Sequence, residues 1–67
     1  MPKPQKYTDV ARFLRRSGWA ILRTGKGSHE VWHNGHDKLI IPHHREVSAG
    51  IIKQISDTIP TTPDSWR

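Results

Sequence analysis

The sequence predicts an α+β fold, a two-layer sandwich with the element order α-β-β-β-α. Apolar side chains recur at helical spacing in residues 7–19 and again in residues 48–59, while residues 19–42 contain three short apolar runs separated by glycine-containing turns. Two amphipathic helices that pack on one face of a three-stranded antiparallel sheet account for this order. The opposite face of the sheet is then expected to stay at least partly open.

The first helix is expected in the segment YTDVARFLRRSGW. Thr8 is the expected N-cap, and Asp9 complements the positive end of the helix dipole. Gly18 supplies a left-handed residue that stops the helix, and Trp19 then folds back over the last turn. The apolar positions that set the helical spacing are Val10, Phe13 and Leu14.

Antiparallel strands are expected in three short apolar runs, which read WAILRT, SHEVWH and DKLIIP. The dipeptide Asn34-Gly35 predicts a tight hairpin turn between the second and third runs, because a type I′ turn needs positive φ at both central residues. Pro42 ends the third strand because proline has no backbone N–H for the ladder. The three strands are therefore expected to form a meander with two tight connections.

The second helix is expected after a loop that covers residues 43–48. Ser48 is the expected N-cap, and Pro60 stops the helix because it lacks the backbone N–H that another turn needs. An apolar stripe gives the helix one face to bury against the sheet. The stripe consists of Ile51, Ile52, Ile55 and Ile59.

Both ends of the chain differ in composition from the part between them. Residues 1–6 hold two prolines and two lysines with nothing to bury, so a flexible N-terminus is expected. Residues 60–67 form a polar C-terminal tail, whose Trp66 is expected to dock either on the domain or on a partner. Residues 7–59 are therefore the expected folded domain.

Size and composition narrow the class of protein. A chain of 67 residues is one small domain of marginal stability, and without cysteine it has neither disulfides nor thiolate metal ligands. The absence of cysteine fits a reducing compartment. No apolar segment resembles a signal peptide or spans a membrane, so a soluble cytoplasmic protein is expected.

Positive charge is concentrated in the first part of the chain. The net charge is +5, but residues 1–26 carry seven bases against one acid, whereas residues 27–67 carry four bases against five acids. Such asymmetry attracts polyanions, nucleic acid first, or an acidic protein partner. The alternative is a solvated basic face that keeps a small protein in solution, and composition leaves both interpretations open.

All five histidines lie close together in the chain, at His29, His33, His36, His43 and His44. A histidine-rich tract invites a metal-binding hypothesis. Structural zinc sites usually contain cysteine ligands, and the chain has no cysteine. No aspartate or glutamate lies at a spacing typical of a metal site. The last two histidines are adjacent, so their side chains point in different directions if the loop is extended. No purpose-built metal site and no cofactor are therefore expected.

The turn before His29 carries groups suited to RNA cleavage. RNA brings its own nucleophile, the 2′-hydroxyl next to the scissile phosphate, so a ribonuclease needs a general base, a proton donor and cations around the phosphate. Arg23 and Lys26 supply the cations, and Ser28 supplies a hydrogen-bond donor. His29 supplies an imidazole, the side chain best suited to take and give protons near neutral pH. The alternative is a strand-edge histidine that only hydrogen-bonds a neighbour, and spacing alone leaves it open.

The other four histidines have simpler explanations. His33 and His36 flank the predicted hairpin tip, where a solvent-facing role is expected. His43 and His44 lie in the loop after the third strand, where they either contact phosphate or are solvated.

The remaining conspicuous side chains are tryptophans and arginines. Trp19 and Trp32 are expected in the core, because the chain has little other large apolar mass. Arg12, Arg15 and Arg16 are expected to form a solvated helix face that also meets RNA or an acidic partner.

Three motifs follow one another along the chain: a helix that ends in Gly-Trp, a Gly-Ser-His at the second strand, and a Pro-His before the second helix. They lie in the segments FLRRSGWAILRTGKGSHEVW and LIIPHHREVSAGIIKQI, which together resemble HicA, the toxin of HicA/HicB toxin–antitoxin pairs. The resemblance runs from about Tyr7 to Ile59. It implies a fold like the double-stranded RNA-binding domain, with the order α-β-β-β-α.

The resemblance also implies an activity, a site and a partner. HicA proteins are metal-independent mRNA interferases of type II toxin–antitoxin systems, so residues 7–59 are expected to be an endoribonuclease domain that inhibits translation. The family's catalytic histidine corresponds to His29, and its flanking glycine and serine correspond to Gly27 and Ser28. HicA is neutralised by HicB, which covers the active histidine, so a hetero-oligomeric complex with the antitoxin is expected.

The expected function is therefore cleavage of mRNA through His29. Arg23, Lys26 and Lys38 are expected to hold the phosphate. One alternative is a non-catalytic RNA-binding module, which would grip RNA by shape and charge without cleaving it. The other is an interaction protein whose histidine-rich tract binds zinc or nickel.

Overall fold

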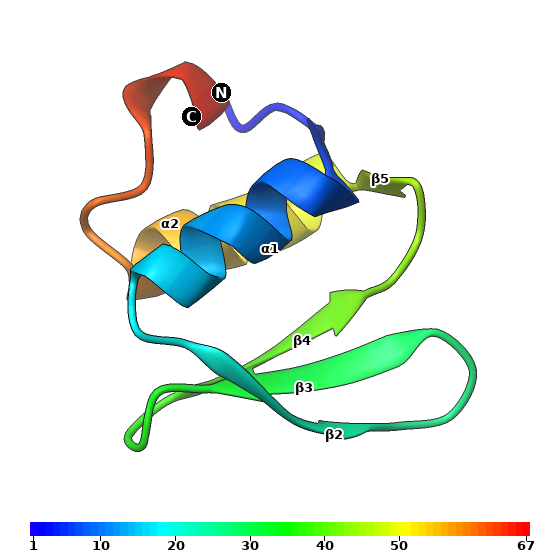
Figure 1. Cartoon of the computed structure of the whole chain (residues 1–67). Coiled ribbons are helices and arrows are strands. Elements are labelled where there is room, and N and C mark those ends of the chain that lie inside the picture. The colour runs from blue at the N-terminus through cyan, green and yellow to red at the C-terminus, as the bar shows by residue number, and fades with distance from the viewer.

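Two helices cover one face of a three-stranded antiparallel sheet (Figure 1). This arrangement in the computed structural model, which describes residues 1–67, confirms the predicted α+β class and the order α-β-β-β-α. A small two-stranded sheet is added to the predicted elements. The elements are β1 (Gln5–Lys6), α1 (Tyr7–Arg16), β2 (Ala20–Thr24), β3 (His29–His33), β4 (Lys38–Pro42), β5 (Glu46–Val47), α2 (Ala49–Thr58) and the 3₁₀ helix η1 (Asp64–Trp66).

The alternation of side chains along β3 and β4 decides which residues face the helices. Trp32 pairs with Leu39, and both side chains are buried. Glu30 pairs with Ile41, and this pair is buried as well. Ile40, between the two inward residues of β4, faces the other way and is 55% exposed. The sheet therefore has one covered and one open face, as the sequence predicts.

One hydrophobic core fills the space between the helices and the sheet. Trp32 has an exposed fraction of 0% and is the largest of the fully buried side chains. Trp19, just beyond the end of α1, is also buried, so both tryptophans belong to the core as predicted. The other buried apolar residues are Tyr7, Val10, Ala11, Leu14, Leu39, Ile41, Val47, Ile52, Ile55, Ile59 and Trp66.

Helix α1 begins earlier than the sequence predicts. Lys6 occupies the N-cap position without a side-chain cap, and Thr8 lies inside the first turn, so the prediction of Thr8 as the N-cap is wrong. The helix follows directly from β1, and the backbone N–H of Tyr7 donates to the carbonyl of Arg45 at 3.1 Å. Strand pairing thus sets the start of this helix in place of a capping side chain. At the other end, Gly18 has a φ of 86°, which confirms the left-handed stop.

Strands β1 and β5 lie in segments for which the sequence predicts no regular structure. Residues 1–6 are predicted to be flexible, and the segment between β4 and α2 is predicted to be a loop. In the structure Gln5 pairs with Val47, and Lys6 pairs with Glu46. Two-residue strands carry too little alternation to be recognised in a sequence, because the pattern needs several residues to repeat.

The hairpin between β3 and β4 forms as predicted, but its turn has a different conformation. Gly35 has a φ of 96°, whereas Asn34 has a negative φ, so the predicted type I′ turn with two left-handed residues is wrong. The side-chain oxygen of Asn34 accepts hydrogen bonds from the backbone N–H groups of His36 at 2.8 Å and Asp37 at 2.7 Å. These bonds stabilise a longer connection than the two-residue turn, because the asparagine side chain replaces a backbone acceptor.

Strand β2 is the exposed edge of the three-stranded sheet. All of its residues are exposed, including the apolar Ile21 at 39% and Leu22 at 46%. The register with β3 shifts between Ile21 and Arg23, which makes a β-bulge at Leu22. A bulged edge discourages pairing with the strands of another molecule.

Helix α2 buries its isoleucine stripe as predicted. Ile52, Ile55 and Ile59 are buried, and Ile51 packs against the core while partly exposed. Ser48 holds the predicted N-cap position through its backbone, since its carbonyl accepts from the N–H of Ile52 at 3.0 Å and no side-chain cap forms. With 10 residues each, neither α-helix has the length and apolar character that a membrane span requires.

The C-terminal tail folds back onto the domain. Trp66 in η1 is 9% exposed and meets the ring of Phe13 edge-on, with the ring centroids 5.3 Å apart. Its carbonyl accepts a hydrogen bond from the backbone N–H of Lys3 at 2.8 Å, so the two ends of the chain lie together (Figure 1). Of the two predicted docking places for Trp66, the structure shows the domain itself.

Replacing Trp66 by alanine is expected to lower the free energy of unfolding by about 3 kcal/mol, because the change removes a buried indole from its contact with Phe13 and leaves a cavity. Trp66→Phe retains part of the contact and should cost less. Ser65→Ala, at an exposed neighbour, is the matched control and should change stability by less than about 0.5 kcal/mol. Urea denaturation followed by circular dichroism measures all three variants. Wild-type stability in Trp66→Ala would contradict the docking of the tail.

Candidate functional site

The predicted catalytic histidine lies on the last rung of the β3–β4 ladder. His29 is the first residue of β3 and pairs with Pro42, the last residue of β4. One step beyond, the backbone N–H of His43 donates to the carbonyl of Ser28 at 2.7 Å. The turn before β3 and the segment after β4 are therefore joined at the same end of the sheet.

The turn before His29 is tight and is held by its own backbone. The N–H of Gly25 donates to the carbonyl of His29 at 2.6 Å, and the N–H of His29 donates to the carbonyl of Lys26 at 3.3 Å. Gly27 has a φ of 62°, a conformation in which any other side chain would be strained. Lys26, which belongs to this turn, is exposed and lies three residues before His29.

His29 is exposed on the open face of the sheet. Its neighbour Glu30 is buried on the helix side, so the alternation along β3 directs His29 away from the helices. Arg23 pairs with Val31 across the β2–β3 ladder and so shares the open face with His29. A histidine and an arginine are therefore presented together on a surface that no helix covers.

Lys38 is separated from this group. It pairs with His33 at the far end of the ladder, four residues along β3 from His29, which corresponds to roughly 13 Å of strand. The predicted site residues that lie at the His29 end of the sheet are Arg23, Lys26, Gly27, Ser28 and His29.

Ser28 makes its side-chain hydrogen bond to a histidine other than the predicted one. Its Oγ lies 2.7 Å from the Nε2 of His44, which is exposed. The sequence predicts Ser28 as a hydrogen-bond donor at the RNA-cleaving turn, and it predicts solvent or phosphate as the partner of His44. The bond between them ties the turn before β3 to the segment after β4 a second time.

A buried carboxylate lies on the covered face of the sheet, next to His29 in the chain. Glu30 is 6% exposed, and its Oε1 accepts hydrogen bonds from the Tyr7 hydroxyl at 2.5 Å and from the Trp32 indole N–H at 3.2 Å. Its Oε2 lies 3.0 Å from the Nδ1 of His43. No buried side-chain polar atom of the chain lacks a partner. Helix α1, β3 and the segment after β4 therefore meet at this carboxylate.

Glu30 is absent from the predicted site, although the sequence holds a signal for it. Alternation along SHEVWH puts Glu30 on the same side as Trp32, which is expected in the core. An acidic residue at an inward position of a strand needs buried hydrogen-bond partners, because an unpaired charge is costly there. The sequence does not say which residues supply them, since Tyr7 and His43 lie far away along the chain.

The Tyr7 hydroxyl is held firmly in its protonated form. The pKa of Tyr7 is raised to about 12, chiefly by burial and further by the hydrogen bond to Glu30 and the negative charge of that carboxylate, while Arg15 acts in the opposite direction. The raised pKa means that Tyr7 remains a hydrogen-bond donor to Glu30 throughout the neutral range.

The ring of His43 has a fixed orientation even though its side chain is 61% exposed. It packs on the ring of Tyr7, with the ring centroids 3.8 Å apart and an angle of 56° between the planes. Because a carboxylate oxygen accepts, the Nδ1 of His43 donates to Glu30, and Nε2 is left without a partner within the chain.

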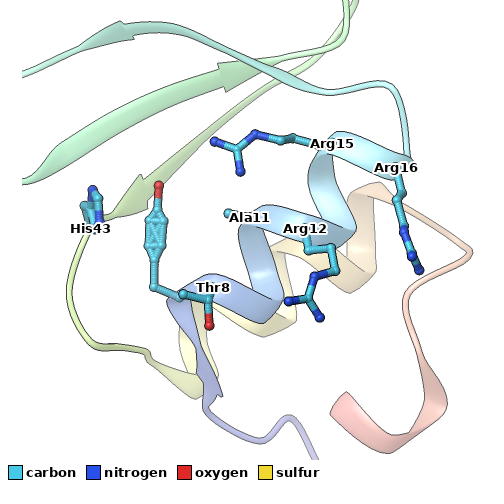
Figure 2. Close-up of a pocket in the computed structure, with 7 residues that line it drawn as sticks. Thr8, Ala11, Arg12, Arg15, Arg16 and His43 are labelled. Atoms are coloured by element: carbon cyan, nitrogen blue, oxygen red, sulfur yellow. The ribbon is translucent and has the colours of Figure 1, made fainter.

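A pocket of about 470 Å³ opens between α1 and His43 (Figure 2). Figure 2 shows the side chain of Arg15 reaching from α1 toward the part of the pocket where His43 lies. The guanidinium carbon of Arg15 lies 5.3 Å from the centre of the Trp32 ring. The residues that line the pocket are Tyr7, Thr8, Ala11, Arg12, Arg15, Arg16 and His43.

The histidines do not converge on a common point. No three side chains among histidine, aspartate and glutamate lie close enough together to hold a metal ion. His36 is exposed at the hairpin tip, and His33 is half-buried at the end of β3. The five histidines thus have separate surroundings, and only His43 and His44 hydrogen-bond another side chain through their rings.

Fold and surface together define a class of protein: a small α+β domain with an exposed histidine beside a glycine turn and a basic face on its first helix. The chain belongs to the HicA toxin family, because the family described as the HicA toxin of bacterial toxin–antitoxin matches residues 7–59. It is therefore a toxin of a toxin–antitoxin system. The match confirms the resemblance predicted from the sequence. The chain has no significant match among curated proteins or solved structures.

The environment of Tyr7 can be measured directly, because Tyr7 is the only tyrosine of the chain. A titration of phenolate absorbance in wild-type protein should give a pKa of about 12 in place of the ordinary 10.0. Glu30→Gln should lower this pKa, because the carboxylate charge is removed, but burial should keep it above 10.0. Glu46→Gln, at an exposed carboxylate, is the control and should leave the titration unchanged. An ordinary pKa in the wild type would contradict the buried hydrogen bond.

The same shift predicts how stability depends on pH. Since the folded-state pKa of Tyr7 lies above the unfolded value, its stabilising contribution is complete below pH 10 and is lost as the pH rises toward about 12. Chemical denaturation at several alkaline pH values should show this decrease in the free energy of unfolding. Tyr7→Phe should show a flatter profile in that window, because it has no phenolic proton to lose.

Proposed function

We propose that this toxin is a metal-independent endoribonuclease that cleaves mRNA with His29 as its general acid–base group and so stops translation. One observation carries the proposal: His29 is exposed on the open face of the sheet, beside the tight turn that carries Lys26. His43 and His44 already have side-chain partners within the chain, whereas the ring of His29 has none. His29 is therefore free to exchange a proton with a bound substrate.

The proposed reaction needs no covalent residue from the protein. The 2′-hydroxyl of the RNA attacks the adjacent phosphorus while the bond from phosphorus to the 5′ oxygen breaks, which leaves a cyclic phosphate and a free 5′-hydroxyl. His29 carries out one of the two proton transfers, either by taking the proton from the 2′-hydroxyl or by delivering one to the departing 5′ oxygen, and water carries out the other. Lys26 and Arg23 stabilise the negative charge that accumulates on the phosphate.

The part proposed for Ser28 is structural. Its hydroxyl is engaged by His44, and its carbonyl accepts from the backbone of His43. Ser28 therefore supports cleavage by holding the turn in position, and Gly27 does so by taking up the left-handed conformation that the turn requires. Lys38, at the other end of the ladder, would contact a nucleotide further along the RNA.

The proposed protein partner is a HicB antitoxin that covers His29 in a hetero-oligomeric complex. Two features of the surface support such a partner. The open face and the edge of the sheet expose the apolar side chains of Ile21, Leu22 and Ile40. The net charge of +5 favours association with an acidic protein.

A non-catalytic RNA-binding module is the second candidate function. It is favoured by the arginines of α1, which lie on the helix side of the sheet, away from the face that carries His29. Such a module would bind RNA in a salt-sensitive manner and release it intact.

His29→Ala is expected to reduce the rate of RNA cleavage by about 10²- to 10⁴-fold, because a positioned general acid–base group contributes about that much. Single-turnover cleavage of a defined single-stranded RNA, resolved on a gel, measures the effect. His36→Ala, an exposed histidine at the hairpin tip, is the matched control and should cleave at the wild-type rate. Both variants should keep the wild-type circular dichroism spectrum and bind HicB. Undiminished cleavage by His29→Ala would remove His29 from the mechanism, and intact RNA with the wild type would favour the binding module.

A further inference from the structure

The pocket between α1 and His43 carries positive charge that the chain does not neutralise. Arg12, Arg15 and Arg16 line it, and none of them forms an ion pair, since the chain has only the pairs of Lys53 with Asp57 and His43 with Glu30. Three guanidinium groups without acidic partners repel one another. An anion in the pocket would relieve that repulsion.

Two acidic side chains lie near the arginines, and neither compensates them. Glu30 is buried, and its oxygens are occupied by three other side chains. Asp9 lines a separate hollow together with Arg12 and Arg16, on the side of α1 toward the C-terminal tail, without coming within ion-pair distance of either. The pocket itself is therefore open to an acidic ligand.

The side of the pocket formed by His43 is already ordered by contacts within the chain. His43 is fixed by Glu30 at Nδ1 and by the ring of Tyr7 at its face, so its Nε2 is the ring nitrogen left for a ligand. A ligand that enters between α1 and His43 thus meets a fixed imidazole on one side and, on the other, the side chain of Arg15, which reaches from α1 toward His43 (Figure 2). Guanidinium groups match phosphate oxygens in geometry as well as in charge.

The pocket is directly connected to the turn that carries His29. The backbone N–H of His43 donates to the carbonyl of Ser28, and His29 occupies the next position in the chain. His29 faces the open side of the sheet, whereas His43 contacts Glu30 on the covered side. A strand of RNA that passes around this end of the sheet therefore meets His29 on the open side of the sheet and His43 on the covered side.

We propose that the pocket between α1 and His43 binds a backbone phosphate of the RNA substrate, as a second subsite apart from the phosphate that is cut. This inference rests on the proposed function, because it assumes that RNA lies at His29. An acidic side chain of a protein partner has similar chemistry. RNA is favoured because His43, which lines the pocket, is hydrogen-bonded to Ser28 in the turn before His29, and because every nucleotide of a strand offers a phosphate.

The test measures binding separately from cleavage. In the His29→Ala background, which should leave the RNA uncut, Arg12→Gln and Arg16→Gln are combined, and the affinity for a fluorescently labelled single-stranded RNA is measured by anisotropy at several salt concentrations. The dissociation constant should rise about tenfold at low salt, and the slope of log affinity against log salt concentration should become shallower by about 0.7, since one phosphate contact on a single strand contributes about that much.

The matched control removes the same charge elsewhere. Lys3→Gln combined with Lys53→Gln lowers the net charge by two at exposed positions that line no pocket. The control should weaken RNA binding by less than about twofold. Equal losses in both double variants would overturn the inference, because net charge alone would then explain the effect. Unchanged RNA binding together with weaker binding to HicB would also overturn it and would assign the pocket to the protein partner.

The inference and the proposed function can fail independently. If the arginine variant loses affinity for RNA but wild-type protein leaves RNA intact, the phosphate subsite is supported and the cleavage proposal is contradicted. If wild-type protein cleaves RNA and the arginine variant binds it normally, the cleavage proposal is supported and the subsite is overturned.

Discussion

The carboxylate of Glu30 is the interaction on which the rest of the site depends. It lies on the covered face of the sheet, where an unpaired charge would be strongly destabilising. Tyr7, Trp32 and His43 satisfy its oxygens, and these residues come from α1, β3 and the segment after β4. One buried group therefore fixes a helix, a strand and a loop relative to one another. The hydrophobic core of this small domain has 13 buried residues. The hydrogen bonds of Glu30 add to that core by fixing the relative positions of the elements that meet at the carboxylate.

The anchor also divides the molecule into two chemically different sides. On the helix side, it orients His43, and the arginines of α1 that line the pocket form no ion pair. On the open side, the residue before it in the chain is His29, which has no side-chain partner. Because successive residues of a strand point to opposite faces, the inward position of Glu30 and the outward position of His29 require each other. A shift of one residue in the register of β3 would exchange them.

The sequence predicts the elements whose side-chain pattern is periodic along the chain. Helical spacing identifies α1 and α2, and alternation together with glycine turns identifies the three-stranded sheet. Strands β1 and β5 escape prediction because a two-residue pairing has no periodicity. The cap at Thr8 and the turn at Asn34 fail for a related reason: the backbone partner of Tyr7 and the length of the hairpin loop depend on tertiary structure. The partners of Glu30 also come from distant segments, so the sequence signals a buried acid without identifying its contacts.

The meeting of the chain ends has a consequence for the topology of the domain. The N–H of Lys3 and the carbonyl of Trp66 are hydrogen-bonded at 2.8 Å, on the side of the helices away from the sheet (Figure 1). A short glycine linker could therefore close the polypeptide into a ring, and new termini could be opened at the exposed tip around Gly35 without cutting a helix or a strand. In such a circular permutant, α2 would precede α1 in the chain, with η1, the linker and β1 between them, and the two-layer packing would persist with a different order of synthesis.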